Sequence, residues 1–176
     1  MSLTPWAPEY RRLSTGIVAL VSVFGFEGIA IAAVMPVAAT DLNAISNYAV
    51  TFTSFTMASL LGMSFAGLWA NKLGLARVVI FAIATLAIGS LVAGFAPILA
   101  VLTIGRSLQG FALGLDLVTM YVVIGRMYPE SLRAKALGML AAAWVVPGLI
   151  GPGLAGLLVE ISSWRMTFWI VPLLLV

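Results

Sequence analysis

Long apolar runs separated by short polar stretches divide this chain into six segments. A helix needs roughly 20 apolar residues to cross about 30 Å of hydrocarbon, because it rises about 1.5 Å per residue. Five runs have about that length and a sixth is shorter; together they cover residues 15–38, 48–70, 78–96, 98–124, 136–159 and 166–176. The pattern therefore predicts a bundle of membrane-spanning helices.

The last run differs from the others in length. As a helix, residues 166–176 would rise only about 16 Å, so we expect a sixth span that is cut short. Lipid offers no hydrogen bonds to the backbone, and each run should therefore be helical despite its glycines and prolines. No soluble domain or flexible linker is visible. We expect residues 1–176 to form a single transmembrane domain of an all-α membrane protein.

Composition agrees with the bilayer as solvent. The chain is 62% hydrophobic and 9% charged, whereas soluble domains carry about 25% charged residues. Cysteine and histidine are missing from the sequence, which excludes disulfides and removes the commonest metal ligands. The sequence also contains no phosphate-binding loop and no nucleophile with a matching base. We expect no enzyme activity, no metal and no cofactor.

Basic residues are concentrated in alternate stretches between the apolar runs. Cytoplasmic loops of membrane proteins collect lysine and arginine, so these stretches predict a cytoplasmic amino terminus. We expect a multi-pass protein of the cell (inner) membrane. The net charge of +3 is too thinly spread to suggest nucleic acid as a partner. The residues concerned are Arg11, Arg12, Lys72, Arg77, Arg126, Arg133 and Lys135.

Three ionisable residues interrupt the apolar runs themselves, namely Glu27, Arg106 and Asp116. A charged residue at the centre of a spanning helix costs at least about 2.5–3.5 kcal/mol on insertion scales, and such residues usually line a transport pathway. Glu27 lies near the middle of the first run, in FGFEGIAIAAVMP. It is a candidate proton carrier; the alternative is a protonated or hydrogen-bonded carboxyl with a structural role.

The fourth run places several polar residues on related faces of one helix. At 100° per residue, Gln109 and Asp116 fall within about 20° of one line, and Arg106 lies about 80° from Asp116. All three can face one cavity. Arg106 and Asp116 are about 15 Å apart along the axis, so each needs a partner on another helix, and Glu27 is the candidate for one of them. The alternatives are a structural clamp for Arg106 and a hydrated interfacial position for Asp116.

Four motifs occur along the chain. After the second run, GLWANKLGLAR is similar to the loop pattern G-x-L-A-D-R/K-x-G-R-R/K, with an asparagine at the position of its aspartate. In the fourth run, LTIGRSLQG matches L-x-x-x-R-x-x-Q-G. The fifth run, WVVPGLIGPGLAG, is similar to G-x-x-x-G-P-x-x-G-G, with Pro147 at its first glycine. Glu27 and Pro36 have the spacing of the acidic residue and the proline in L-D-x-T-I-V-N-V-A-L-P.

Together these motifs resemble the drug:proton antiporters of the major facilitator superfamily, over essentially the whole chain. The resemblance implies a six-helix bundle that forms the amino-terminal half of the major facilitator fold. It implies proton-coupled antiport of small hydrophobic or cationic compounds such as drugs. Together with the buried charges, it predicts three groups of site residues: a proton-coupling and substrate cavity of Glu27, Arg106, Gln109 and Asp116; a gating loop with Gly67, Asn71, Lys72, Gly74 and Arg77; and an antiporter seam with Gly148, Gly151, Pro152 and Gly156.

Other interpretations remain open at this stage. The glycine and proline seam is also explained by helix packing alone, because small residues are common wherever membrane helices meet. The chain either belongs to a longer transporter of twelve or fourteen spans, whose carboxy-terminal half is missing here, or pairs with a second half-transporter. A non-transporting membrane fragment, an assembly partner, or a carrier for another small solute of the same fold are the alternative functions.

Overall fold

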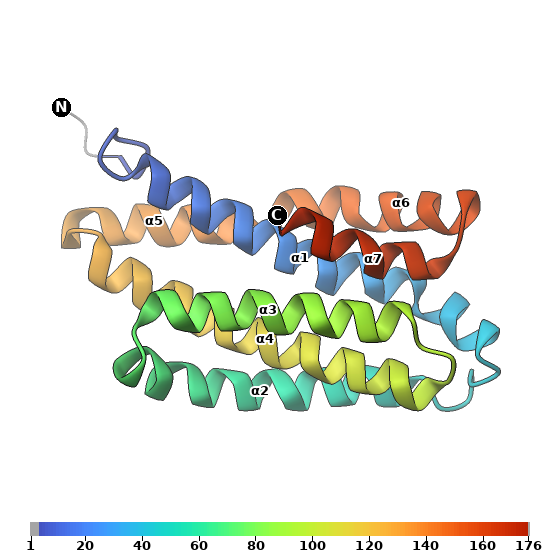
Figure 1. The fold of residues 1–176 in the computed structure, drawn as a ribbon. Helices are drawn as coiled ribbons and strands as arrows, with labels where there is room; N and C mark the ends of the chain where they lie inside the picture. The colour runs from blue at the N-terminus through green and yellow to red at the C-terminus, as the bar shows by residue number, and fades with distance from the viewer. Residues whose placement is uncertain (1–3, 176) are drawn as a thin grey trace.

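The computed structural model describes residues 4–175, which are almost entirely helical and contain no strand (Figure 1). Five helical segments within that range are long and apolar enough to cross a membrane, with 130–161 taken as one segment. The helices are α1 (Arg11–Asp41), α2 (Ala49–Lys72), α3 (Leu75–Gly94), α4 (Leu99–Met127), α5 (Glu130–Ala142), α6 (Val145–Ile161) and α7 (Trp164–Leu174).

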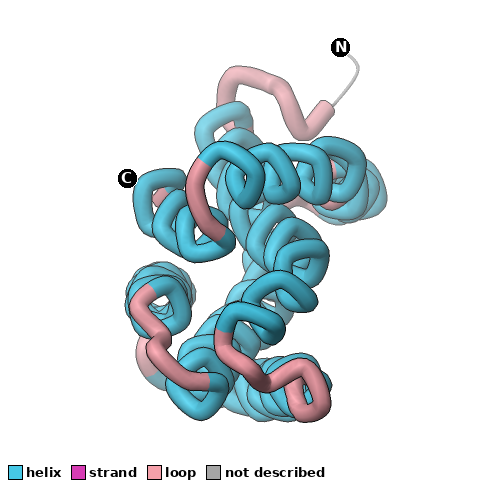
Figure 2. The backbone as a smooth tube through the Cα atoms, turned by 90° about the vertical axis from the view of Figure 1, so that its right-hand side faces the viewer, coloured by secondary structure: helices cyan, strands magenta, loops and turns pink. Residues whose placement is uncertain are grey.

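The helices form two layers that run alongside each other (Figures 1 and 2). In one layer α4 lies between α2 and α3 and packs extensively against both. In the other layer α1 packs against α6, and α7 lies beside both of them. The layers meet where α7 contacts α3 and, over a smaller area, where α1 contacts α4.

Glycines allow α4 to approach both of its neighbours at backbone distance. A Cβ atom on Gly105 would lie 2.6 Å from the backbone nitrogen of Ala93 in α3. On the other side of α4, a Cβ on Gly110 would overlap the backbone carbonyl of Phe55, and one on Gly114 would overlap that of Ser59. Small residues at such crossings are the usual means by which membrane helices come close together. They fix which residues of α2 and α3 lie opposite each residue of α4.

The run 136–159 is divided in the structure. Helix α5 begins earlier, at Glu130, and ends at Ala142, and α6 begins at Val145. Pro147 explains the break, because proline has no N–H to donate to the carbonyl four residues earlier and its ring crowds that carbonyl. The carbonyl in question is that of Ala143, and it accepts a hydrogen bond of 3.1 Å from the Ser22 hydroxyl of α1 instead. A neighbouring helix thus supplies the hydrogen bond that this backbone carbonyl has lost, because lipid has no donor to offer it.

Each of the remaining helices extends beyond its apolar run by a few residues at one end at least, and α2, α3 and α4 fall short of it by one or two residues at the other end. Helix α1 covers Arg11–Asp41 against the run 15–38, and α4 covers Leu99–Met127 against 98–124. The additional turns carry polar or charged residues that an apolar run does not include. Helix α7 covers Trp164–Leu174 against 166–176, and residue 176 lies outside the described residues.

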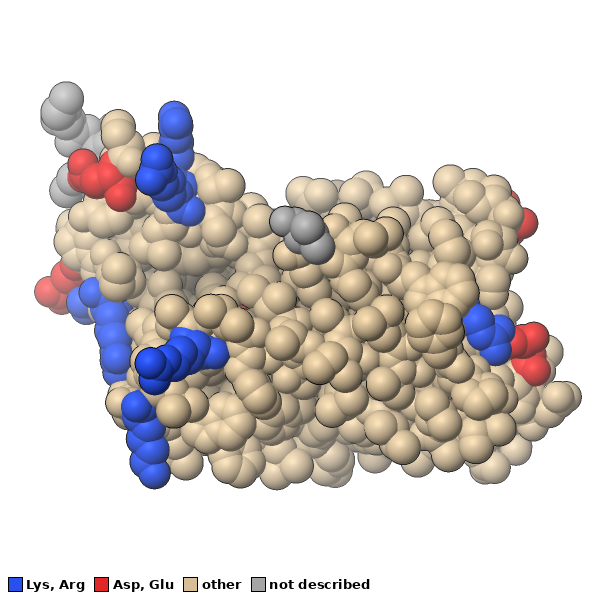
Figure 3. Space-filling view, viewed as in Figure 1, with Lys and Arg blue, Asp and Glu red and all other residues tan. Residues whose placement is uncertain are grey.

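On the face shown in Figure 3, charged side chains gather at the two ends of the bundle and the surface between them is formed almost wholly of uncharged residues. Many large apolar side chains of the described residues are exposed. One end, which we call the basic end, carries the start of α1, the turn between α2 and α3 and the turn between α4 and α5. At the opposite end, Arg165 donates hydrogen bonds to Asp41 Oδ2 at 2.9 Å and to the Ala96 carbonyl at 3.2 Å. The indole of Trp164 donates to the same Asp41 oxygen at 3.0 Å.

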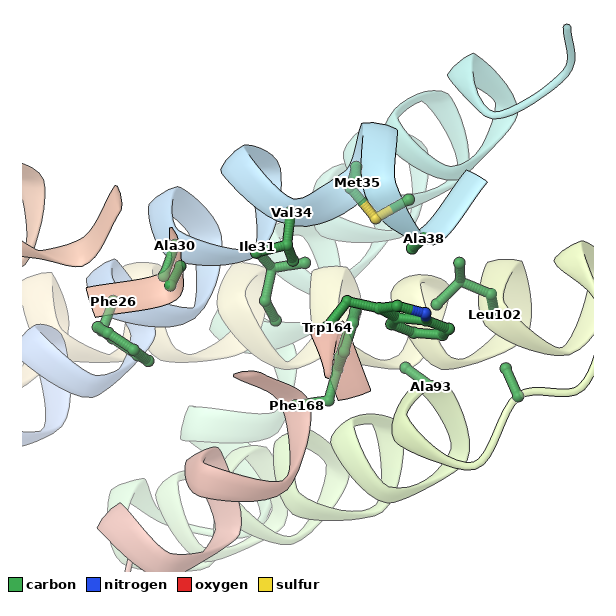
Figure 4. Close-up of a cluster of buried hydrophobic side chains, with 12 residues drawn as sticks. Phe26, Ala30, Ile31, Val34, Met35, Ala38, Ala93, Leu102, Trp164 and Phe168 are labelled. Carbon is green, nitrogen blue, oxygen red and sulfur yellow. The ribbon is translucent and has the colours of Figure 1, made fainter. Parts of the chain in front are cut away.

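A buried apolar cluster lies beneath that opposite end. Figure 4 shows Trp164 and Phe168 of α7 lying among Ile31 and Val34 of α1 and Leu102 of α4. The cluster therefore includes residues of both layers. It holds the layers together on one side of the polar residues that lie deeper in the bundle.

Candidate functional site

A buried ion pair joins the two layers of the bundle. Arg106 of α4 donates from Nη1 to Oε1 of Glu27 in α1. The exposed fraction of the side chain is 2% for Arg106 and 0% for Glu27. Of the two residues for which Glu27 was a candidate partner, the structure pairs it with Arg106, and both side chains point into the protein interior.

A polar chain continues from this pair to a third helix. The same Nη1 of Arg106 donates to Oε1 of Gln109 at 2.9 Å. The amide nitrogen of Gln109 then donates to the hydroxyl of Ser90 in α3, also at 2.9 Å. Gln109 and Ser90 are fully buried. The chain from Glu27 to Ser90 thus connects α1, α4 and α3 without passing through solvent.

An aromatic ring from α2 completes the surroundings of the guanidinium. The Arg106 Cζ atom lies 4.2 Å from the centroid of the Phe55 ring. A cation placed over an aromatic face is attracted by the ring's quadrupole, and the attraction grows when water is excluded. Phe55 is held there by the close crossing of α2 and α4 at Gly110. Arg106 therefore has contacts from three other helices, directly or through Gln109.

The network leaves two polar atoms of the pair unused. Neither Oε2 of Glu27 nor Nε of Arg106 has a hydrogen-bond partner within the described residues, and both atoms are buried. A buried polar atom without a partner is costly and uncommon outside functional sites. The pair can therefore still accept one hydrogen bond and donate one. This capacity suits a group that takes up and gives off a proton, or that meets a polar ligand.

Asp116 lies outside this network. It is as buried as Arg106, with 2% of its surface exposed, but no ion pair or hydrogen bond to its side chain is present among residues 4–175, and its Oδ1 atom is buried without a partner. The structure brings Glu27, Arg106 and Gln109 together and does not join Asp116 to them.

A separate hollow opens toward the basic end of the bundle (Figure 3). Its volume is about 450 Å³, and its lining is mostly apolar side chains of α1, α3, α4 and α7, among them Ile17, Leu20 and Met120. None of the four candidate cavity residues lines it. Within residues 4–175 no three carboxylates, histidines or cysteines come together as a metal site would need.

The residues of the predicted gating loop lie at the end of α2, in the turn that follows it and at the start of α3, and two of them have a clear structural role. Gly74 has φ of 87° and ψ of 153°, a conformation that residues with a side chain rarely adopt, so glycine is needed at this turn. Asn71 accepts a hydrogen bond of 2.7 Å from Arg126, at the end of α4. Gly67 meets open space, and Lys72 and Arg77 are exposed.

The glycine and proline seam of α6 presents two faces with different surroundings. Pro147, Gly151 and Ala155 are buried, and a Cβ on Gly151 would lie 3.7 Å from Ala30 in α1. The ridge of Gly148, Pro152 and Gly156 is half-buried or exposed. A Cβ on Gly156 would meet nothing within 4 Å. One face of the seam is therefore used for packing on α1 in this structure, and the other is open.

Three contributors to the site were not identified from the sequence. Ser90 and Phe55 contact the polar chain, and Ser22 supports the break before α6. Ser90 directly follows Gly89, where a Cβ would lie 2.9 Å from the Gly105 carbonyl. That glycine–serine pair inside an apolar run was an available signal. Nothing in the local sequence distinguishes Phe55 from the other aromatic residues that face the bundle.

Comparison with known proteins identifies the family of this chain. The family model described as Major Facilitator Superfamily matches residues 15–176. The chain is 28% identical over 166 residues to a protein of Mycobacterium tuberculosis named "Probable multidrug-efflux transporter", covering 93% of this chain and 35% of that protein. It is 26% identical over 157 residues to "Multidrug efflux pump SdrM" of Staphylococcus aureus, covering 88% and 35% respectively.

A third relative is "Multidrug transporter protein MdtP" of Bacillus subtilis, with 27% identity over 158 residues, 90% of this chain and 29% of the relative. The chain thus spans about a third of the length of the curated relatives it matches. The family match covers nearly all of the helical bundle. This chain is therefore a multi-pass membrane protein that belongs to the major facilitator superfamily, a family of transporters and not of enzymes.

Proposed function

We propose that this chain supplies the amino-terminal helices of a proton-coupled exporter of small hydrophobic or cationic compounds. The observation that carries the proposal is the fully buried ion pair between Glu27 and Arg106. A buried ion pair gives little net stability compared with apolar residues of similar size. Ionisable residues inside a membrane bundle mark proton relays and substrate pathways. We therefore assign the pair a role in transport.

The pair offers a simple way to link a proton to a substrate. When Glu27 is ionised, its charge is balanced by Arg106 and the site is neutral as a whole. Protonation of Glu27 leaves the Arg106 charge unbalanced, held by Gln109 and Phe55. A cationic compound then binds less well than before. The affinity for the compound therefore differs between the two protonation states of Glu27. Through this difference, proton binding can bias the inward-facing against the outward-facing conformation.

The choice of substrate class rests on chemistry and on relatives. The carboxylate is paired with a guanidinium that lies over the Phe55 ring, and apolar side chains surround the pair, a setting that suits a compound with a positive charge and an apolar body. Proteins that resemble this chain are named as multidrug transporters. Both facts support lipophilic cations as substrates in place of sugars or amino acids.

The charges of the two ends support a particular arrangement in the membrane. We propose that the basic end faces the cytoplasm of a cell with this chain in its inner membrane, since lysine and arginine collect in cytoplasmic loops. The Asn71–Arg126 hydrogen bond then lies on the cytoplasmic side, where the gating loop is expected. Residues 1–176 would form one transmembrane domain. A carboxy-terminal half, or a second half-transporter, would form the other wall of the substrate cavity.

The proposal is tested by efflux driven by a pH gradient. The full-length protein that carries this chain is reconstituted into proteoliposomes, with ethidium as a lipophilic cation probe. We expect Glu27→Gln to abolish the part of ethidium efflux that depends on the gradient. Glu160→Gln is the matched control, because Glu160 is an exposed carboxylate at the end of α6. Full gradient-driven efflux by the Glu27→Gln protein would remove Glu27 as the proton site.

A further inference from the structure

The polar chain at the ion pair reaches a residue that lies outside the motif of α4. Gln109 donates from Nε2 to the Ser90 hydroxyl of α3 at 2.9 Å. Both side chains are fully buried. In the part of the chain that the structure describes, Ser90 has no hydrogen bond to either member of the ion pair, and its one polar link to them runs through Gln109. Its effect on the pair must therefore depend on how Gln109 is oriented.

The chemistry of the two neighbours determines which end of the Gln109 amide faces Arg106. A guanidinium has donors and no acceptor, so the amide oxygen must face it and the amide NH₂ must point the other way. There the NH₂ needs an acceptor, and the bilayer interior supplies no water to replace one. The Ser90 oxygen is that acceptor. Without it, the orientation that serves Arg106 leaves a buried NH₂ unsatisfied.

The close crossing of α3 and α4 fixes the position of Ser90. The neighbouring Gly89 faces the Gly105 carbonyl and Gln109 Cγ, and a Cβ at position 89 would lie 2.9 Å and 3.0 Å from these atoms. Gly105 in turn has the backbone nitrogen of Ala93 at 2.6 Å from the place of its own missing Cβ. The two backbones are therefore in contact on both sides of Ser90 along α3. The hydroxyl has little freedom to move away from Gln109.

We propose that Ser90 is a positioning residue for the Arg106–Glu27 pair and acts through the Gln109 amide. The inference rests on the proposed function, in which Glu27 takes up and releases a proton. By holding the amide, Ser90 keeps one Arg106 nitrogen shared between Gln109 and Glu27. Loss of the hydroxyl frees the amide to turn, and the electrostatic surroundings of the Glu27 carboxyl change with it. A hydroxyl that served helix packing alone would have no such effect.

The test is an infrared titration of Glu27, which requires no knowledge of the substrate. The full-length protein carries isotope-labelled glutamate, and the Glu27 carboxyl band is assigned by its loss in Glu27→Gln. The midpoint of the band is followed with pH in wild type, Ser90→Ala, Gln109→Leu and the double variant. Thr85→Val is the control, since it removes a buried hydroxyl from the same helix and Thr85 has no hydrogen bond to Gln109.

We expect Ser90→Ala to shift the midpoint by roughly 0.5–1 pH unit, which corresponds to a net hydrogen bond. Gln109→Leu should shift it in the same direction, and the double variant should add nothing to Gln109→Leu alone. Ser90→Thr keeps a hydroxyl, and its Glu27 carboxyl should titrate with the wild-type midpoint. Thr85→Val should also leave the midpoint unchanged.

The outcomes separate this inference from the function on which it rests. If Glu27 titrates but Ser90→Ala leaves its midpoint unchanged, or shifts it additively with Gln109→Leu, Ser90 is not a positioning residue and the proposed function stands. If Thr85→Val shifts the midpoint as much, the effect is one of packing and the inference fails. If no Glu27 band titrates in the wild-type protein, the proposed proton site and the inference both fail.

Discussion

Helix α4 carries two buried ionisable side chains whose surroundings are opposite in kind. Arg106 has an ion pair with α1, a hydrogen bond to Gln109 and an aromatic ring from α2. Asp116 is equally buried, yet among residues 4–175 no hydrogen bond or ion pair reaches its side chain. Burial alone therefore does not identify a coupled site. What differs is the number of helices that converge on the charge.

The glycines of α4 allow the other helices to come close to Arg106. Gly105 and Gly110 lie on either side of Arg106 and allow α3 and α2 to approach at backbone distance. Small residues thus determine which polar groups meet in the interior, although they make no polar contact themselves. Because the Arg106 network spans four helices, its removal should affect the whole bundle. A change at Asp116 should remain local.

The largest expected effect is that of Arg106→Leu. It leaves the Glu27 carboxylate buried without its partner, and removing one member of a buried pair costs about 3–5 kcal/mol. We expect a loss of that order in the free energy of unfolding, measured by denaturant titration in mixed micelles. Arg126→Leu, at an exposed position, should lose at most about 1 kcal/mol.

Adding Glu27→Leu to Arg106→Leu sharpens this test, because the pair is then replaced by apolar residues. Most of the lost stability should return. If the double variant is as unstable as Arg106→Leu, the instability does not come from an unpaired carboxylate.

A smaller effect is expected from Gly110→Ala. The new Cβ overlaps the Phe55 carbonyl, so α2 must move away from α4 and from Arg106. Overpacking of this kind costs about 1–3 kcal/mol. Gly67→Ala is the matched control in α2, since its Cβ meets nothing within 4 Å, and it should be neutral or stabilising. Equal unfolding free energies for the two variants would contradict the role given to the α2–α4 crossing.

Phe55→Leu tests the aromatic contact alone. Leucine keeps an apolar side chain but removes the ring under the guanidinium, and a desolvated cation–π contact contributes about 0.5–2 kcal/mol. Phe55→Tyr keeps the ring and is the control. The difference between the two variants should disappear in an Arg106→Leu background. A difference that persists there would show that the ring acts through packing.

The smallest effect should come from Asp116→Asn. The substitution keeps the shape of the side chain and breaks no ion pair or hydrogen bond to a described residue. We expect the free energy of unfolding to fall by no more than about 1 kcal/mol, the net value of a single hydrogen bond. A loss as large as that of Arg106→Leu would show that Asp116 has a strong partner and would break the contrast between the two positions.

Much of the fold could be predicted from the sequence because hydrocarbon imposes a simple rule on length and polarity. The apolar runs located α1 to α4 to within a few residues. The cost of an isolated charge in lipid made Glu27 a candidate partner for Arg106 or Asp116, and the structure pairs it with Arg106. The break between α5 and α6 was missed, because it depends on the absent N–H of Pro147 and on a hydroxyl supplied by Ser22 of another helix.

The contacts around the pair could not be predicted in the same way. Ser90 and Phe55 reach Arg106 and Gln109 only because helix crossings bring them there, and crossings depend on three-dimensional packing. For Asp116, the sequence pattern suggested a shared site that the structure does not contain. The helical wheel placed it near the line of Gln109, but its distance along the axis and the absence of a described partner keep it apart from the network.

The central claim is that protons enter the transport cycle through Glu27 when it is paired with Arg106. It is tested most directly by measuring proton release when ethidium binds to the full-length protein in weakly buffered detergent solution. We predict proton release from wild type and from Asp116→Asn, and none from Glu27→Gln. Release from Glu27→Gln equal to that of wild type, or its loss in Asp116→Asn alone, would contradict the account.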